Sequence, residues 1–303
     1  MKNSITYSIG LFALAIVVSC ATDDATGPNA EAYINIPDAH FETMLIEQGF
    51  DSDGVVNQKI LKEDAEKVIQ LDINFSGAIG EIEDLAGIEG FVNLKFLSAA
   101  SQNLTAIDLS QNVLLDTLSL SGNSIAAIDL SNNTNLIYLD LQANEFTSAG
   151  DIYGLSEMTG LKDLDLSWNY LEEFSIHNKT LEVLHISHND LVSLNTTGAI
   201  NLQHVFIPSN KLQVVDFTTN ILLETLLISG NLLQTIDLEQ NANLTHLYIS
   251  SNLLNRLDVS HNEQLFDLRV DRNSDLSCIR IFSGQEIATV MLSEYQKLNV
   301  SCE

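Results

Sequence analysis

The stretch Leu136–Asn144 has the sequence LIYLDLQAN, and the stretch Leu161–Asn169 has the sequence LKDLDLSWN. In both, three leucines and a final asparagine stand at the same offsets. The first leucine of this unit recurs, mostly every 21 residues, at Leu94, Leu115, Leu136, Leu161, Leu181, Leu202, Leu223, Leu244 and Leu265. A fixed period with apolar residues at fixed offsets is typical of a solenoid, in which each repeat buries its apolar side only against its neighbours. The pattern therefore predicts a repeat array.

Each unit also predicts its own local structure. The Leu-x-Leu alternation predicts a strand with one buried face, and stacked copies would form a parallel sheet. The asparagine should turn the chain out of the strand, because its amide can donate to and accept from backbone groups that stacking leaves unpaired. Gln102 takes this place in the first copy. The segments that follow, such as Ile107–Ser110 (IDLS), are too short for an ordinary helix, so we expect an outer wall that is largely extended.

The Leu-x-x-Leu-x-Leu-x-x-Asn unit resembles that of the leucine-rich-repeat family, with nine copies in residues 93–273. The resemblance implies an α/β solenoid: a horseshoe with a concave parallel sheet, a largely extended convex side and a helical N-terminal cap. It also implies a role in binding, although a fold alone names no ligand.

Both ends of such an array need covers over the apolar face of the last repeat. Residues 33–92 are predicted to form the N-terminal cap, with one helix that starts after Pro37-Asp38 and ends at Gly49, and a second near Lys62–Val68. Residues 274–303 are predicted to form the C-terminal cap. The segment Ile36–Phe41, followed by Asp51–Val56, resembles the N-terminal portion of flavobacterial (Bacteroidetes) leucine-rich-repeat surface lipoproteins.

The segment Asp51-x-Asp53-Gly54 also resembles part of an EF-hand calcium loop. An EF-hand needs a further acidic ligand two residues before Asp51 and a bidentate glutamate seven residues after Asp53, whereas this chain has Gly49 and Ile60 there. Because those ligands are missing, we expect a tight Asp-Gly turn between two helices of the cap.

The N-terminus carries the features of an export signal. Residues 1–19 contain Lys2 and a short apolar run, which predicts a signal peptide. The sequence Val17–Cys20 resembles the lipobox of bacterial lipoproteins, which implies that Cys20 is the acylated first residue of the mature chain. Residues 20–32 form a polar, acidic tether. Its pair Asp23-Asp24 resembles the surface-export signal of Bacteroidetes lipoproteins, so the resemblance implies an outer-membrane lipoprotein exposed at the cell surface.

The composition fits an exported domain that contacts the membrane only through its lipid anchor. The chain has 41 acidic and 13 basic residues, a formal net charge of −28, so nucleic acid is excluded as a partner. Besides Cys20, the sequence has only Cys278 and Cys302, on either side of the last segment. In an oxidising compartment these two predict a disulfide that closes the C-terminal cap. No cofactor motif is present.

The candidate ligand-binding residues flank the buried leucines of the predicted strands. Large aromatic and amphipathic side chains offer much contact area for little lost rotamer entropy, which suits a recognition surface. The candidates are Tyr138, Asp140, Trp168, His185, His204, Phe206, His246 and Tyr248. The earlier strands carry Ser98, Thr117 and Ser119 at these positions. The alternative is that these aromatic residues only cover the sheet and pack against each other, without binding a ligand.

The same region allows two more specific interpretations, a metal site and a catalytic pair. His185, His188 and His204 with Asp163 or Asp165 could ligate zinc, but the side chains of a parallel sheet point the same way rather than toward a centre. An Asp165–His185 pair could serve acid–base chemistry, but no nucleophile elbow, phosphate loop or metalloprotease helix accompanies it. We therefore expect no metal site and no enzyme.

Three classes of function follow. The favoured one is a surface-anchored recognition protein that binds a protein or glycan on its concave face. A structural or adhesive spacer is the alternative, favoured by the bland first strands. A polysaccharide-active β-solenoid enzyme is a third possibility, opposed by the strict asparagine and by the single Leu-x-Leu strand in each unit.

Overall fold

The computed structural model describes residues 32–74 and 82–302. Residues Glu31–Glu303 form one compact unit, to which everything below refers. The predicted signal peptide and Cys20 lie outside the described residues, and so does almost all of the predicted tether. No helix within the described ranges combines the length and the apolar character needed to cross a membrane.

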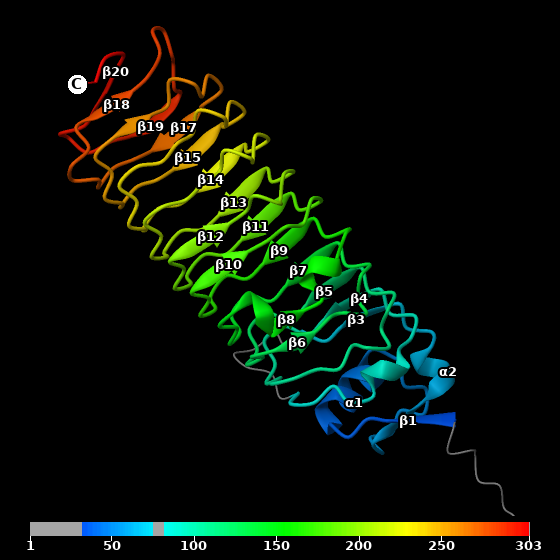
Figure 1. Ribbon diagram of the computed structural model, residues 1–303. Coiled ribbons are helices and arrows are strands. Elements are labelled where there is room, and N and C mark those ends of the chain that lie inside the picture. The colour runs from blue at the N-terminus through cyan, green and yellow to red at the C-terminus, as the bar shows by residue number, and fades with distance from the viewer. Residues whose placement is uncertain (1–31, 75–81, 303) are drawn as a thin grey trace, which may run out of the picture. The chain divides into compact units, whose positions relative to one another are not determined.

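The centre of the unit is an inner sheet of 11 strands, in which all neighbours are parallel and in register (Figure 1). Its strands, in spatial order, are β3 (Gln70–Asp72), β4 (Phe96–Ser98), β5 (Thr117–Ser119), β7 (Tyr138–Asp140), β9 (Asp163–Asp165), β11 (Val183–His185), β13 (His204–Phe206), β14 (Thr225–Leu227), β15 (His246–Tyr248), β17 (Asp267–Arg269) and β19 (Thr289–Met291). The middle residue of each strand from β3 to β17 is completely buried. The predicted parallel sheet is confirmed, and its register follows from burying one residue in two.

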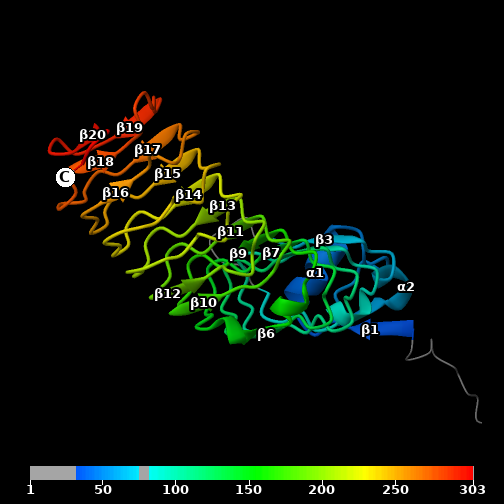
Figure 2. The same cartoon turned by 45° about the horizontal axis from the view of Figure 1, so that its top comes forward.

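The outer wall is largely extended, as predicted. Figure 2 shows its short strands along the side of the unit opposite the inner sheet. They are β6 (Ile128–Asp129), β8 (Ile152–Tyr153), β10 (Glu173–Ser175), β12 (Ser193–Asn195), β16 (Leu257–Asp258), β18 (Cys278–Arg280) and β20 (Lys297–Asn299). Single turns of 3-10 helix occur at η2 (Ile88–Gly90), η3 (Ala149–Asp151) and η4 (Leu155–Glu157). An extended wall of this kind takes fewer residues per coil than a wall of full helices would.

The recurring asparagines form an inner ladder beside the sheet. The side-chain amide of Asn189 donates to the carbonyl of Leu166 at 2.9 Å, one coil away, and its Oδ1 accepts the backbone N–H of Leu171 at 3.0 Å. Asn189 is 7 % exposed, so these bonds satisfy backbone groups that no water reaches. Gln102 and Gln296 make the corresponding amide-to-carbonyl bonds at the two ends of this ladder.

A second, outer ladder was not predicted from the sequence. Asn241 is fully buried, and its amide donates to the carbonyls of Phe217 and Asn220 at 3.0 and 2.9 Å. Further members are Asn112, Asn133, Asn220 and Asn262, with Gln285 at the C-terminal end. The sequence signal was the asparagine two residues after the serine in the Ile-Asp-Leu-Ser-x-Asn segments. Each coil is thus fastened to its neighbour on both sides of the core.

The N-terminal cap contains the predicted helices. Helix α1 (Ala39–Glu47) starts after Asp38, whose carboxylate accepts the backbone N–H of His40 at 2.8 Å and of Phe41 at 3.0 Å. Burial would raise the pKa of Asp38, but these amides and those of residues 83 and 84 hold it below its usual value. Strands β1 (Tyr33–Asn35) and β2 (Lys59–Leu61) pair antiparallel, and the short helix α2 (Lys62–Ala65) follows.

The C-terminal segment continues the coil pattern, because it supplies β19 to the inner sheet and β18 and β20 to the outer wall. The predicted disulfide is confirmed: Cys278 and Cys302 are joined, with their Cα atoms 5.7 Å apart. Ile287 and Leu292 remain partly exposed, whereas the buried positions of the interior coils are covered on both sides. The bond therefore ties down an end that no helix covers among the described residues.

Candidate binding face

The outward positions of the inner sheet form two ladders that run along the array. The register pairs Asp165 with His185, and His185 with Phe206. The ladder at the third position of each strand, called the recognition ladder, consists of Asp72, Ser98, Ser119, Asp140, Asp165, His185, Phe206, Leu227, Tyr248, Arg269 and Met291. Tyr138, His204 and His246 lie on the parallel ladder at the first strand position.

Two ring stacks lie in the middle of this face. The rings of His185 and Phe206 are 4.4 Å apart between centroids, and those of Trp168 and His188 are 3.9 Å apart; in both pairs the planes differ by 6°. Stacked pairs are held in one orientation by their mutual contact. Because Trp168 is still 54 % exposed, the stack presents an ordered aromatic surface to solvent.

The structure places Trp168 and His188 in the turn after the strand rather than on the strand, which the sequence did not reveal. Each stands directly before an asparagine of the inner ladder with a positive φ, 58° for Trp168 and 53° for His188. Six other coils have a small residue there, and one has Arg272; the small residues are Ser101, Gly122, Ala143, Ser209, Gly230 and Ser251, and all seven positions have positive φ. A large side chain in this left-handed conformation is unfavourable. The fold needs only the backbone at this position, so packing does not explain the tryptophan.

An acidic patch adjoins the stacks on strands β7 and β9. Burial raises the pKa of Asp163, and the charges of Asp165 and Asp140 raise it further, while His185 opposes them. Burial likewise raises the pKa of Asp165. Burial and these three carboxylates raise the pKa of Tyr138 to about 12. One carboxylate oxygen of Asp163 is enclosed without a hydrogen-bond partner. The patch thus holds negative charge that its own surroundings neutralise only in part.

Near the C-terminal end of the face, the side chains already contact one another. The hydroxyl of Tyr248 donates to Asp267 at 2.8 Å, and Arg269 lies 4.0 Å above the Tyr248 ring while pairing with Asp267 at 3.1 Å. The structure therefore divides the predicted site residues: Trp168, His185 and Phe206 gather near the acidic patch with Tyr138 and Asp140, whereas Tyr248 belongs to a separate, internally paired group.

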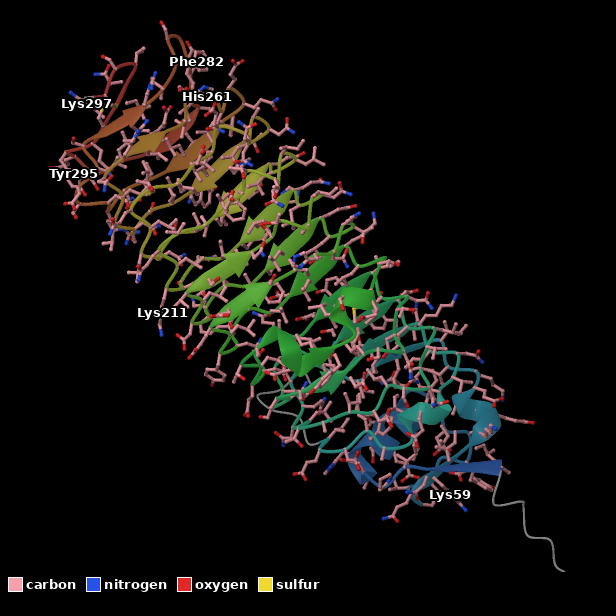
Figure 3. The ribbon with its side chains drawn as sticks, in the orientation of Figure 1. Lys59, Lys211, His261, Phe282, Tyr295 and Lys297 are labelled. Atoms are coloured by element: carbon pink, nitrogen blue, oxygen red, sulfur yellow. A yellow bond between two sulfur atoms is a disulfide. The ribbon has the colours of Figure 1, made fainter. Side chains whose placement is uncertain are left out.

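In the part of the chain that the structure describes, the candidate histidines and aspartates do not form a metal centre of three or more ligands. No group of three or more His, Cys, Asp or Glu residues within the described ranges is placed to hold a metal ion. Lys59, Lys211 and Lys297 lie far apart along the array (Figure 3).

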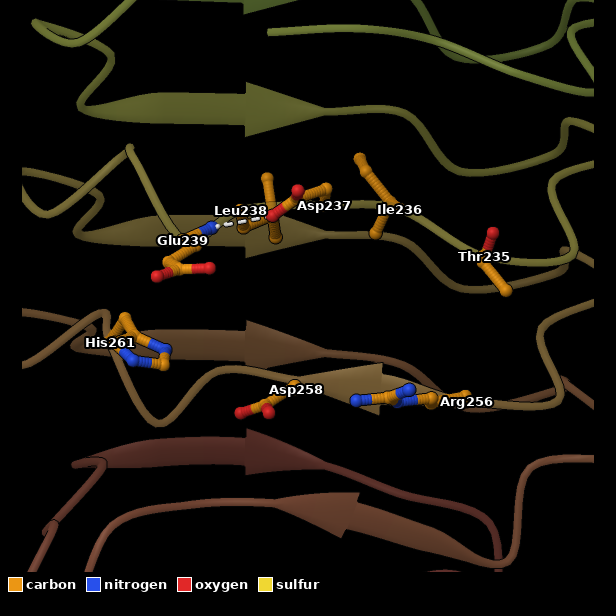
Figure 4. A pocket seen from close by; sticks show the side chains of 8 residues that line it. All are labelled: Thr235, Ile236, Asp237, Leu238, Glu239, Arg256, Asp258 and His261. Atoms are coloured by element: carbon orange, nitrogen blue, oxygen red, sulfur yellow. Dashed lines mark hydrogen bonds between the residues drawn. The ribbon is translucent and has the colours of Figure 1, made fainter. Parts of the chain in front are cut away.

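Several hollows lie on the outer wall. One hollow of about 360 Å³ lies between two successive coils and is lined by Thr235–Glu239, Arg256, Asp258 and His261 (Figure 4). A similar hollow near Ile107, Asp108 and Asp129 occupies the corresponding place between earlier coils. Because the hollow recurs with the repeat, it is a product of stacking rather than a specialised pocket.

The sequence matches no protein-family model and no curated protein sequence. The structure resembles the leucine-rich repeat domain of APL1, with a TM-score of 0.60 and 22 % identity over 78 % of this chain and 67 % of that chain. It also resembles a chain in the LRIM1/APL1C complex (0.58, 23 %, 78 % and 47 %) and an internalin C2 from Listeria monocytogenes (0.54, 19 %, 85 % and 94 %). The repeat spacing, the inner parallel sheet and these likenesses agree that the chain has the leucine-rich-repeat fold.

Proposed function

We propose that this protein is a recognition module that binds a protein partner on its inner sheet, at the surface formed by Trp168, His188, His185 and Phe206. The observation that carries the proposal is the exposed Trp168–His188 stack, formed from two turns at a position where six other coils use Ser, Gly or Ala. A large residue in an unfavourable conformation, which the core does not need, is best explained by contact with a ligand.

The acidic patch supports a partner with basic groups facing Asp140, Asp163 and Asp165. Aromatic anchors beside charged residues are typical of the centre of protein interfaces, where a few large side chains dominate the binding energy. One of the similar structures is itself a complex of two proteins, LRIM1 and APL1C, so proteins with this fold can associate. A spacer would not need this concentration of large residues in a few coils.

The test is binding of candidate proteins and of an array of glycans to the purified protein and two variants. Trp168→Ala should weaken binding by at least about 2 kcal/mol, or roughly thirtyfold, as the loss of a central aromatic anchor usually does. Tyr153→Ala is the matched control, because Tyr153 is an aromatic residue of similar exposure, 59 %, on the outer wall. Equal loss in both variants, or binding only to glycans, would contradict the proposal.

We also propose that Cys20 anchors the protein to the outer membrane with its body at the cell surface. The support is the lipobox-like sequence before Cys20 and the acidic pair after it. Buried lipid contributes about 0.8 kcal/mol per methylene, so Cys20→Ser should release the protein from the membrane fraction. Unchanged retention of Cys20→Ser would refute the anchor, and resistance of the native protein to protease on intact cells would refute surface exposure.

A further inference from the structure

The loop between α1 and β2 contains a buried carboxylate oxygen without a partner. Asp51 is only 4 % exposed, and its Oδ2 is enclosed with no hydrogen-bond partner. Its other oxygen accepts the backbone N–H of Asp53 at 3.3 Å, which is a long bond. A buried polar atom of this kind costs free energy unless something satisfies it.

Three more carboxylates, on the loop and on the two helices, interact electrostatically with Asp51. Glu42 is fully buried on α1 and accepts the backbone N–H groups of residues 57, 58 and 59 at 2.9 to 3.0 Å. Asp64 on α2 is 8 % exposed and accepts the N–H of Ser52 at 3.2 Å. The charges of Asp53, Glu42 and Asp64 add to burial, the largest cause, in raising the pKa of Asp51.

The cations nearby do not reach the unpaired oxygen. The ammonium of Lys67 pairs with Asp64 at 3.0 Å, and that of Lys59 lies 4.4 Å from the centre of the Tyr33 ring. Glu42 and Asp64 already hold the loop through backbone amides, so their role is to fix its shape and supply a negative field. The oxygen of Asp51 is the one atom of the group that lacks a positive or hydrogen-bonding neighbour.

The local sequence has the form of a cation-binding turn. Asp51, Asp53 and Gly54 have the spacing of the third, fifth and sixth positions of an EF-hand loop. Gly54 has a φ of 65°, as a sharp turn requires, which confirms the predicted Asp-Gly turn. The loop that follows Asp51 is solvent-exposed from Ser52 to Gln58.

We propose that the loop Asp51–Asn57 binds a calcium ion through Asp51 Oδ2, with the Asp53 carboxylate, backbone carbonyl oxygens and water completing the shell. All donors are oxygen, which favours a hard cation, and calcium accepts six to eight such ligands in flexible geometry. Two direct carboxylates are consistent with the finding that no three such side chains converge within the described ranges. Such a site belongs to the weak class, with a Kd of about 0.1 to 1 mM, as in extracellular modules.

The ion would stabilise the cap that covers the first coil, because its ligands lie in the loop that Glu42 on α1 and Asp64 on α2 already hold by hydrogen bonds. The test measures the binding of calcium by calorimetry and the melting temperature of the metal-depleted protein, both at constant ionic strength. At a calcium concentration of about 100 times Kd, the ratio of folded to unfolded protein should rise roughly a hundredfold. Magnesium should act more weakly, because it requires near-ideal octahedral geometry and retains its water.

Asp51→Asn keeps the shape of the side chain and removes its charge. It should lower calcium affinity about tenfold or more and abolish most of the rise in melting temperature. Glu63→Gln is the matched control, because Glu63 is exposed on α2 beside Asp64 and the variant changes net charge equally. Its response to calcium should match that of the native protein.

The alternative is that Asp51 is simply a buried acid that carries a proton. In that case calcium would have no effect on the native protein, and Asp51→Asn would be as stable or more stable without calcium; this result would overturn the proposal. Equal effects of calcium and magnesium, or equal calcium responses in Asp51→Asn and Glu63→Gln, would show general screening of the net charge and would also overturn it. If Asp51→Asn fails to fold, Asp53→Asn at the exposed ligand provides the same comparison.

Discussion

The first strands of the inner sheet and its middle strands share one backbone but present different surfaces. At β4 and β5 the recognition ladder carries Ser98 and Ser119, and the turn that follows β5 carries Gly122. At β9 to β13 the same ladder carries Asp165, His185 and Phe206, with Trp168 and His188 in the turns. Both regions bury an apolar residue at the centre of each strand and place a buried amide side chain after the strand, which is Gln102 after β4 and asparagine elsewhere. Buried positions therefore set the scaffold, and outward positions vary without altering it.

The largest expected effect tests whether the scaffold is uniform. Leu118→Ala in β5 and Leu184→Ala in β11 each remove a completely buried leucine. Each should lower the free energy of unfolding by about 2 to 5 kcal/mol, measured by chemical denaturation. Thr225→Ala, at an outward position of β14, should cost far less. A cost at Leu184 like that at Thr225 would mean that the two regions do not share one core.

The inner asparagine ladder gives a second comparison of the two regions. Asn123 donates to the carbonyls of Ala99 and Leu120 at 2.9 Å and accepts from Leu104, much as Asn189 does in the middle of the array. Replacement of either asparagine by alanine leaves buried backbone groups unsatisfied, at a cost of about 1 to 3 kcal/mol. Melting curves should show similar losses for the two variants. A loss confined to Asn189→Ala would mean that the ladder stabilises only the middle coils, which carry the aromatic residues.

The third comparison separates binding from stability at the turn position. Trp168→Ala removes the stack on His188, which contributes about 0.5 to 1.5 kcal/mol beyond buried area. The variant should thus destabilise the fold by no more than about 1.5 kcal/mol, and Ser209→Ala, at the same position of another coil, by less. Loss of folding in Trp168→Ala would show that the tryptophan packs the scaffold rather than serving recognition.

Periodicity predicted the scaffold well because each buried leucine repeats the same local physics. The in-register ladder of Asp165, His185 and Phe206, the cap on Asp38 and the disulfide follow from spacing and residue type. The surface was harder to predict, because a side chain in a turn obeys backbone geometry that a strand pattern does not reveal.

Trp168 and Asp51 illustrate what the sequence could not show. The positive φ of Trp168 depends on hydrogen bonds such as that from its N–H to the carbonyl of Ser187 at 2.8 Å, one coil away. The unpaired oxygen of Asp51 depends on Glu42 and Asp64, which approach from two helices outside the loop. Contacts between distant segments carry no local signature.

The smallest expected effect concerns the acidic patch of the middle strands, which has no counterpart at β4 and β5. Because burial and neighbouring carboxylates raise the pKa of Asp163 above its value in the unfolded chain, the folded state binds more protons in the interval between the two values. Stability should then fall as pH rises through that interval, and the full penalty should be present at pH 7. Asp163→Asn removes it and should stabilise the protein at pH 7 by about 0.2 to 1 kcal/mol, the usual size of cross-strand pair effects.

The gain from Asp163→Asn should shrink as pH falls through the raised pKa of Asp163, because the native carboxyl then becomes neutral as well. Glu145→Gln is the control, because Glu145 is exposed beside the inner ladder and the variant changes net charge equally. Melting temperatures of the native protein and both variants between about pH 4 and 7 would decide the matter. If Asp163→Asn instead lowered stability at pH 7, the carboxylate would be satisfied within the protein. The acidic patch would then be part of the scaffold, and the support that it gives to a basic partner would be withdrawn. A gain equal to that of Glu145→Gln would show only relief of the overall negative charge, and the middle strands would then differ from the first strands in their aromatic residues alone.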